Sequence, residues 1–366
     1  MAGSGIIVKH SFRLTTNNDL RTILAYSWGD YGSPPDKTHF GVQAMMIYHF
    51  TDCGGYYPIG GASEIALNII PVIERAGGKV LVRANVDKIL CTPGGRACGV
   101  RVEKGTEKYE IKAPLVISNA GVYNTFRTLL PKEVSQKSYY SKIASSLKPG
   151  YAGISVFVGL NKNGKELGLK PQNTWAFRNE TDCLKVMVDE FMEADSIEDV
   201  MDKKVPLLFI SFPSEKDPNW STTHPERKDK STVAIVTLGK WEWFSQWVNE
   251  PLKRRGDDYE GTHFRIFHLI MIIFTRSLLT RQKIFPFIHI DILFFLAIKK
   301  TLGHTMVEQA CLLYPQIRDH IDYVDIGTPV TNAHYIAAPH GEIYGLDHTK
   351  ARMSPEVTFM PNFVYW

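Results

Sequence analysis

The stretch that most constrains the fold runs from Gly54 to Leu90, GGYYPIGGASEIALNIIPVIERAGGKVLVRANVDKIL. Its apolar residues recur at the spacing of one helix face, which predicts an amphipathic helix that packs on that face. The residues of this face are Ala62, Ile65, Ala66, Ile69, Ile70, Ile73 and Ala76. Pro71 is expected to kink or break the helix near Ile70. Gly77 and Gly78 are expected to end it.

The glycine turn before this helix does not contain the six-residue pattern G-x-G-x-x-G, which occurs nowhere in the chain. No pyrophosphate-binding turn is therefore predicted here. Gly60 and Gly61 let the backbone pass close to a flat or bulky ligand, and the amides of the first helical turn can meet an anion. A simple tight turn into a helix explains the same residues equally well.

After the helix, the sequence predicts a short antiparallel meander. Val80, Val82, Ala84 and Val86 alternate with polar residues, as in a half-buried strand. Turns at Pro93 to Gly95 and at Lys104 and Gly105 separate it from strands around 98–102 and 109–113. The run LVISNAG, 115–121, is predicted to be a buried strand that ends on small residues beside a ligand.

The middle of the chain predicts an α+β domain. GISVFVGL, PLLFISFPS and STVAIVTL each have the pattern of a strand, and the acidic segment 182–202 is compatible with a helix. Many aromatic residues lie in this region. Core packing is the favoured interpretation of each, and the alternative is the lining of an apolar substrate cavity.

Residues 262–300 are rich in Phe, Ile and Leu, but charged residues divide them into pieces shorter than the ~18 uncharged residues of a spanning helix. An interfacial or buried segment is favoured over a transmembrane helix. A third hypothesis is that the segment is translated intron sequence, because its composition changes abruptly and it has no period.

Composition excludes several classes of function. The 366 residues have a formal charge of +4 with both signs interspersed, so nucleic acid is not expected as a partner. The five cysteines form no C-x-x-C pair, and no H-E-x-x-H, G-x-S-x-G or P-loop occurs. No metal site is expected. His334, His340 and His348 are interpreted as surface or packing residues. No signal peptide is legible at the N-terminus.

Four segments together resemble a known family: the helix unit from Tyr56, VISNAG, SFPSEKDPNW, and GTPVTNAHYIAAPHGEIYGLDH. They are similar to the all-trans-retinol 13,14-reductase (retinol saturase) branch of the carotenoid desaturase and isomerase flavoproteins. The resemblance covers most of 20–260 and 301–366.

The resemblance implies an enzyme that binds FAD and saturates the 13,14 double bond of all-trans-retinol, giving all-trans-13,14-dihydroretinol. NAD(P)H is a possible electron donor, and the family is associated with the endoplasmic reticulum membrane. The cofactor-binding positions that it implies are Gly60, Gly61, Val86, Ala120 and Gly121. No catalytic residue is assigned; Tyr344 and Asp347 are the candidates to test first.

The fold expected is α/β: a partial FAD-binding, Rossmann-like domain of the phytoene desaturase or amine oxidase type, with an α+β substrate domain. The expected divisions are 1–50, part of a substrate or cap region; 51–130, part of the FAD-binding domain with the meander; 131–260, the substrate domain; 261–300, the apolar insertion; and 301–366, the end of the substrate domain and the start of the last FAD-domain strand.

The resemblance also predicts departures. Relatives place a strand and a G-x-G-x-x-G turn upstream of the position of Met1 and a flavin motif downstream of Trp366, so the chain is expected to be an incomplete form. Two alternatives stay open. One is a carotenoid desaturase or cis-trans isomerase, and the other is a catalytically dead fragment that binds lipid.

Overall fold

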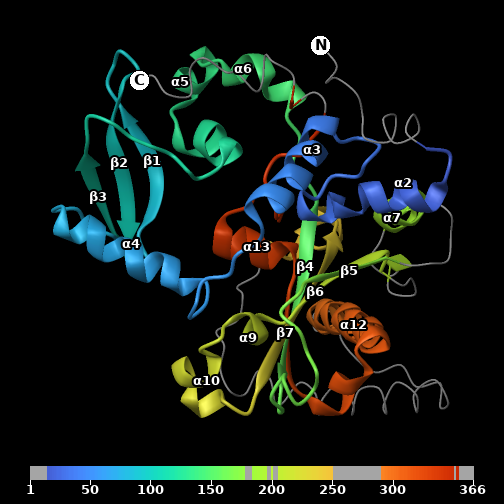
Figure 1. Ribbon diagram of the computed structural model, residues 1–366. Coiled ribbons are helices and arrows are strands. Elements are labelled where there is room, and N and C mark those ends of the chain that lie inside the picture. The colour runs from blue at the N-terminus through green and yellow to red at the C-terminus, as the bar shows by residue number, and fades with distance from the viewer. Residues whose placement is uncertain are drawn as a thin grey trace, which may run out of the picture.

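The computed structural model describes residues 15–177, 184–195, 199–200, 205–249, 290–349 and 352–353. It is a mixed structure of helices and two antiparallel sheets (Figure 1). A three-stranded sheet has the order β1-β2-β3, and a five-stranded sheet has the order β5-β6-β7-β4-β8. A parallel sheet of the Rossmann type is not found among these residues.

The predicted meander is present as β1 (Asn85–Cys91), β2 (Ala97–Lys104) and β3 (Glu107–Lys112). The first strand, however, begins later than the alternation predicted. Arg83 has a φ of 52°, in the left-handed region, and the chain bends at this point. Because an extended strand cannot pass through that conformation, the prediction of a strand over Val80 to Ala84 was wrong.

Helix α4 (Ser63–Arg75) lies beside the meander in Figure 1. It continues through Pro71, so this residue does not break it. The end at Gly77 is confirmed: Gly77 has a φ of 83°, and its amide and that of Gly78 donate to the carbonyls of Glu74 and Ile73. The expectation that one face packs was wrong for the described structure, because no residue of α4 is buried.

The three strands predicted in the middle of the chain are confirmed as β4 (Ala152–Leu160), β6 (Leu207–Ser211) and β7 (Ser231–Gly239). Two more complete the sheet: β5 (Thr174–Phe177) at one edge and β8 (Ile321–Gly327) at the other. β4 pairs with β7 along its whole length, from Ala152 opposite Gly239 to Leu160 opposite Ser231.

Helix α12 (Ile290–Leu313) packs on the five-stranded sheet (Figure 1). Leu302, Met306 and Ala310, four residues apart, are buried in the main core. A side chain at Gly303 would collide with Ile326 of β8, so this glycine permits the close approach of helix and strand. Residues 290–300 belong to the same helix, and 262–289 lie outside the described residues.

The aromatic side chains of the middle region mainly fill the core, as favoured from the sequence. Phe212, Trp243, Phe244 and Trp247 are each at most 5% exposed. A second core cluster joins Trp28, Tyr31 and Val42 to Leu207 and Leu238 of the sheet. Within the described residues, we find no helix with the length and hydropathy needed to span a membrane.

The remaining helices surround the two sheets. They include α2 (Asn18–Ala25), η1 (Tyr26–Asp30), α3 (Phe40–Tyr48), η2 (His49–Cys53), η3 (Asn124–Leu129), α5 (Lys132–Lys137), α6 (Tyr140–Ile143), η4 (Ala144–Ser146), α7 (Leu184–Met192), α9 (Pro213–Lys216), α10 (Trp220–Thr223), η5 (Pro225–Arg227), η6 (Trp241–Trp243), η7 (Ser245–Trp247), η9 (Pro315–His320) and α13 (Pro329–Ile336).

The run 115–121 is not the buried strand that was predicted. It has no strand assignment, and Ile117 is 86% exposed. An apolar run becomes a sheet strand only where a neighbour supplies hydrogen bonds, and no described strand pairs with this one. This prediction was wrong for the described structure.

Candidate functional site

The loop 337–349 connects the predicted site residues to the five-stranded sheet. It follows α13, whose C-cap residue, Ala337, has a left-handed backbone conformation with a φ of 54°. The loop then runs back along the start of β4: Ile343 donates to the carbonyl of Tyr151 at 3.2 Å, and Gly150 donates to that of Gly345 at 2.8 Å. Tyr344 and Asp347 are therefore held on a segment fixed to the sheet.

Ala120 and Gly121 are joined to the same loop. The Asn124 side-chain amide donates to the carbonyl of Ala120 at 2.9 Å and to that of Ala337 at 2.7 Å. Gly121 has a φ of 88°, and a Cβ built on it meets no atom within 4 Å. Two predicted groups of residues, far apart in the sequence, thus meet at this loop, and one of them faces open space.

Tyr344 is held tightly by the η1 region. Its hydroxyl donates to the carbonyl of Gly29 at 2.8 Å, and its ring lies where a side chain at Gly32 would be. Burial, with a smaller contribution from the charge of Asp30, raises the pKa of Tyr344 to about 12. This hydroxyl is therefore a hydrogen-bond donor at neutral pH. Asp347 is anchored by its backbone amide, which donates to the carbonyl of Lys148 at 2.9 Å.

Asp30 is a residue of this region that the sequence analysis missed. Burial raises the pKa of its carboxyl, and the hydrogen bond from the Trp175 indole at 3.0 Å opposes the rise. Asp30 also contributes to the raised pKa of Tyr344. No local pattern in the sequence marks it, because its partners lie 145 and more residues away.

Gly60 and Gly61 have positive φ angles of 87° and 93°, so the turn before α4 needs glycine at both positions. Gly61 donates to the carbonyl of Pro58 at 3.0 Å, closing a tight turn. No side chain caps the start of α4. The hydrogen bonds of this turn are local, and among the described residues none joins it to Ala120 or to the loop 337–349. Both interpretations of the glycines remain compatible with the geometry.

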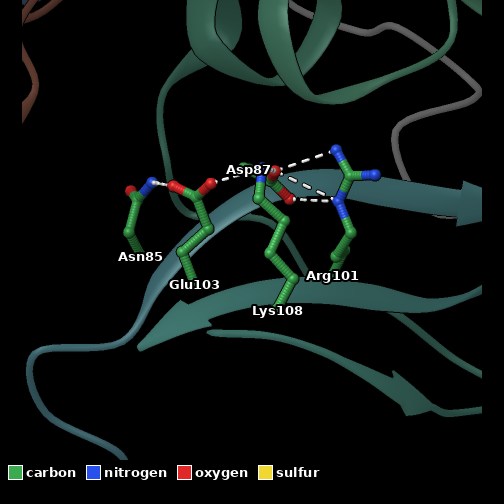
Figure 2. A network of polar contacts seen from close by, with 5 residues as sticks. All are labelled: Asn85, Asp87, Arg101, Glu103 and Lys108. Carbon is green, nitrogen blue, oxygen red and sulfur yellow. Dashed lines mark hydrogen bonds and ion pairs between the residues drawn. The ribbon is translucent and has the colours of Figure 1, made fainter. Parts of the chain in front are cut away.

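Val86 lies on β1 opposite Val102 and is 37% exposed. Beside it, a polar network joins the three strands (Figure 2). The Arg101 guanidinium donates two hydrogen bonds of 2.8 Å to the Asp87 carboxylate, and Lys108 bridges Asp87 and Glu103 at 3.1 and 2.5 Å. The Arg101 hydrogen bond is the largest cause that lowers the pKa of Asp87 to about 2. This network ties β1, at the register shift between Val86 and Lys88, to β2 and β3.

A cavity of about 360 Å³ lies where β4 begins and β7 ends. Its lining combines apolar and charged side chains. The lining residues are Lys37, Pro149, Gly150, Tyr151, Ala152, Asp189, Met192, Glu193, Gly239, Lys240, Trp241, Glu242 and His340. The sequence analysis did not find it, because its wall is assembled from five separate segments. Among the described residues, no group of three His, Cys, Asp or Glu side chains is placed to hold a metal ion.

Comparison with known proteins identifies relatives over almost the whole chain. The chain is 38% identical over 94% of its length to an all-trans-retinol 13,14-reductase of Danio rerio. It is 33% identical over 94% of its length to that of Homo sapiens. The chain is a relative of the all-trans-retinol 13,14-reductases. The family resemblance seen in the sequence is thereby confirmed. No protein-family model matches the chain.

Two further relatives bear on the function. An "inactive all-trans-retinol 13,14-reductase" of Danio rerio is 32% identical over 93% of the chain and 49% of its own length. A phytoene desaturase of Neurospora crassa is 29% identical over 54% of the chain and 31% of its own length. The chain spans about half the length of the retinol reductases that it matches, 49% in both cases above.

Proposed function

We propose that this protein is an FAD-dependent oxidoreductase that saturates the 13,14 double bond of all-trans-retinol to give all-trans-13,14-dihydroretinol. The observation that carries the proposal is the 33–38% identity to proteins with the name all-trans-retinol 13,14-reductase over 94% of the chain. The reaction belongs to retinol metabolism and reduces a C=C bond to a CH–CH bond.

The residues present fit a flavin nucleotide in part. Gly121 has a side open to a ligand, and the irregular run before it exposes the apolar side chains of Leu115 and Ile117. Gly60 and Gly61 precede a helix start that no side chain caps. We propose that these glycines, the backbone of Val86, and Ala120 with Gly121 hold FAD within a Rossmann-like domain. When bound and reduced by an electron donor, the flavin would supply a hydride to the double bond.

The protein's own residues then bind the polyene, exclude water and deliver a proton. Tyr344, with a pKa of about 12 and a hydroxyl bound to Gly29, is better suited to hold a geometry than to release a proton at neutral pH. Asp347 remains the second candidate for a catalytic residue. We further propose, from the family resemblance alone, that NAD(P)H is the electron donor and that the protein associates with the endoplasmic reticulum membrane.

The first test is the visible spectrum of the purified chain after expression with excess FAD. Bound flavin, followed by dihydroretinol in a reaction with all-trans-retinol and a chemical reductant, is the expected result. A Gly121→Val variant is expected to lose the flavin, because the side chain would occupy the open face in a backbone conformation that valine rarely adopts. Gly168→Val, at another exposed positive-φ glycine, is the matched control. A folded, colourless wild-type chain would overturn the proposal for this chain.

A second candidate is a retinoid-binding protein without catalytic activity. It is favoured by the relative named inactive, which matches nearly the whole chain at 32% identity. The two candidates differ in product, not in binding: an inactive protein binds retinol and returns it unchanged. A carotenoid desaturase or isomerase rests on shorter matches, and assays with longer polyenes distinguish it.

A further inference from the structure

The cavity between the ends of β4 and β7 has the composition of a site for an amphipathic ligand. Tyr151, Met192 and Trp241 supply apolar wall, and charged side chains from α7 and from the segment after β7 supply the rest. Its volume of about 360 Å³ is within the usual range of small-molecule sites. An apolar molecule with one polar end matches this lining better than an ion or a pure hydrocarbon does.

His340 stands out in the wall because its ring is held by aromatic contacts and makes no hydrogen bond to a described residue. Its ring lies edge-on to Tyr123, with centroids 6.0 Å apart, and to Trp241, at 6.2 Å. Its backbone amide donates to the buried carboxylate of Glu342 at 2.7 Å. These contacts, from three separate segments, orient the imidazole before any ligand arrives.

The imidazole nitrogens of His340 have no hydrogen bond to a described residue. Nδ1 is sealed from solvent and lacks a partner, whereas Nε2 is not sealed in this way. Because Nδ1 is sealed from solvent, Nε2 is the ring nitrogen that a ligand can reach, and in the tautomer that is protonated there it is a hydrogen-bond donor. The charged side chains of the wall either have a partner or face water. Lys37 lies 4.0 Å from Asp189, and Lys240 donates to the carbonyl of Ala194 at 3.4 Å. Glu193 and Glu242 are exposed to water.

We propose that this cavity binds the hydroxyl end of an apolar alcohol, with the Nε2–H of His340 as the hydrogen-bond donor to the hydroxyl oxygen. For all-trans-retinol as the ligand, this inference rests on the proposed function. The site then fixes one end of the polyene, and Trp241 and Tyr151 contact its apolar part. His340 acts here in binding and carries no redox step.

The test is a titration of the full chain with all-trans-retinol, followed by energy transfer from tryptophan to the bound polyene. A matched polyene hydrocarbon that lacks the hydroxyl is titrated in parallel. His340→Ala is expected to weaken retinol binding about 3- to 10-fold, the usual effect of one hydrogen bond, and to change hydrocarbon binding less than about 2-fold. His340→Gln, which keeps a donor, is expected to recover part of the loss, and Trp241→Phe to reduce the energy transfer.

His334→Ala is the matched control, because this histidine lies nearby on α13 but is exposed and outside the cavity lining. Equal weakening of both ligands by His340→Ala, or no weakening, would overturn the anchoring role, and absence of retinol binding to the wild-type chain would overturn the site. Denaturant midpoints establish that each variant is folded. If retinol binding depends on His340 but no dihydroretinol is formed, the site stands and the proposed activity fails. If retinol is reduced with an unchanged KM in His340→Ala, the activity stands and the site fails.

Discussion

At the scale of single residues, the clearest charge arrangement is Asp87 within its network on the meander. Three guanidinium hydrogen bonds from Arg101 and the ammonium of Lys108 hold its pKa at about 2, below the value of about 3.9 in an unfolded chain. A depressed pKa adds stability that is present above the unfolded value and is lost as the pH falls through the folded one. The Asp87 contribution therefore disappears between about pH 4 and pH 2.

Asp87→Asn is expected to remove this part of the pH dependence. The variant is less stable than the wild type at pH 5, and the difference shrinks as the pH falls toward 2, because both chains then carry an uncharged group at position 87. Urea midpoints at several pH values measure the difference. Glu74→Gln, at an exposed carboxylate on α4, is the control and should follow the wild type. A difference that stays constant with pH would contradict the role of the ionised carboxylate.

At the scale of elements, α13 is the helix that delivers the loop 337–349, and its two ends are built differently. Thr328 and Thr331 form a reciprocal capping box at the start, while Ala337 ends the helix in left-handed backbone. Non-glycine residues pay about 1 to 2 kcal/mol for this conformation, and glycine does not. The start of α13 is therefore stabilised by side-chain hydrogen bonds, whereas its end carries backbone strain.

Ala337→Gly is expected to stabilise the protein by about 0.5–1 kcal/mol, because the relieved backbone strain exceeds the extra entropy of glycine in the unfolded chain. Ala333→Gly, in the middle of the same helix, is expected to destabilise it by about 1 kcal/mol. Thermal or denaturant unfolding measures both. The opposite signs are diagnostic, since equal losses at the two positions would mean that Ala337 is not in left-handed backbone.

Local patterns predicted those elements whose partners lie close in the chain or whose alternation is complete. The hairpins at Gly95 and Gly105 and the strands β4 and β7 were found in this way. Val80 to Ala84 alternates equally well but bends at Arg83, and 115–121 lacks a described strand to pair with. His340, Trp241 and Tyr123 meet from positions up to 217 residues apart, so no sequence window contains their site.

At the scale of the whole molecule, the five-stranded sheet has a packed core, whereas α4 shows its apolar face to solvent. Ile69 of α4 is 53% exposed, and Ile154 of β4 is 1% exposed. The same substitution at both positions is therefore expected to have unequal effects. Ile154→Ala should lower the free energy of unfolding by about 2–5 kcal/mol, because it leaves a cavity in the core. Ile69→Ala should change it by less than about 0.5 kcal/mol, as is usual for a surface position.

Denaturant unfolding of the two variants, with sedimentation to measure self-association, makes this comparison. A loss above about 2 kcal/mol for Ile69→Ala would contradict the exposure of the face and show that something covers it in solution. If that loss falls as the protein is diluted, a second copy is the cover, since dissociation exposes the face again. A loss independent of concentration places the cover within the chain itself. The comparison of Ile69→Ala with Ile154→Ala thus shows whether α4 is uncovered, covered by another part of the chain or covered by a second copy.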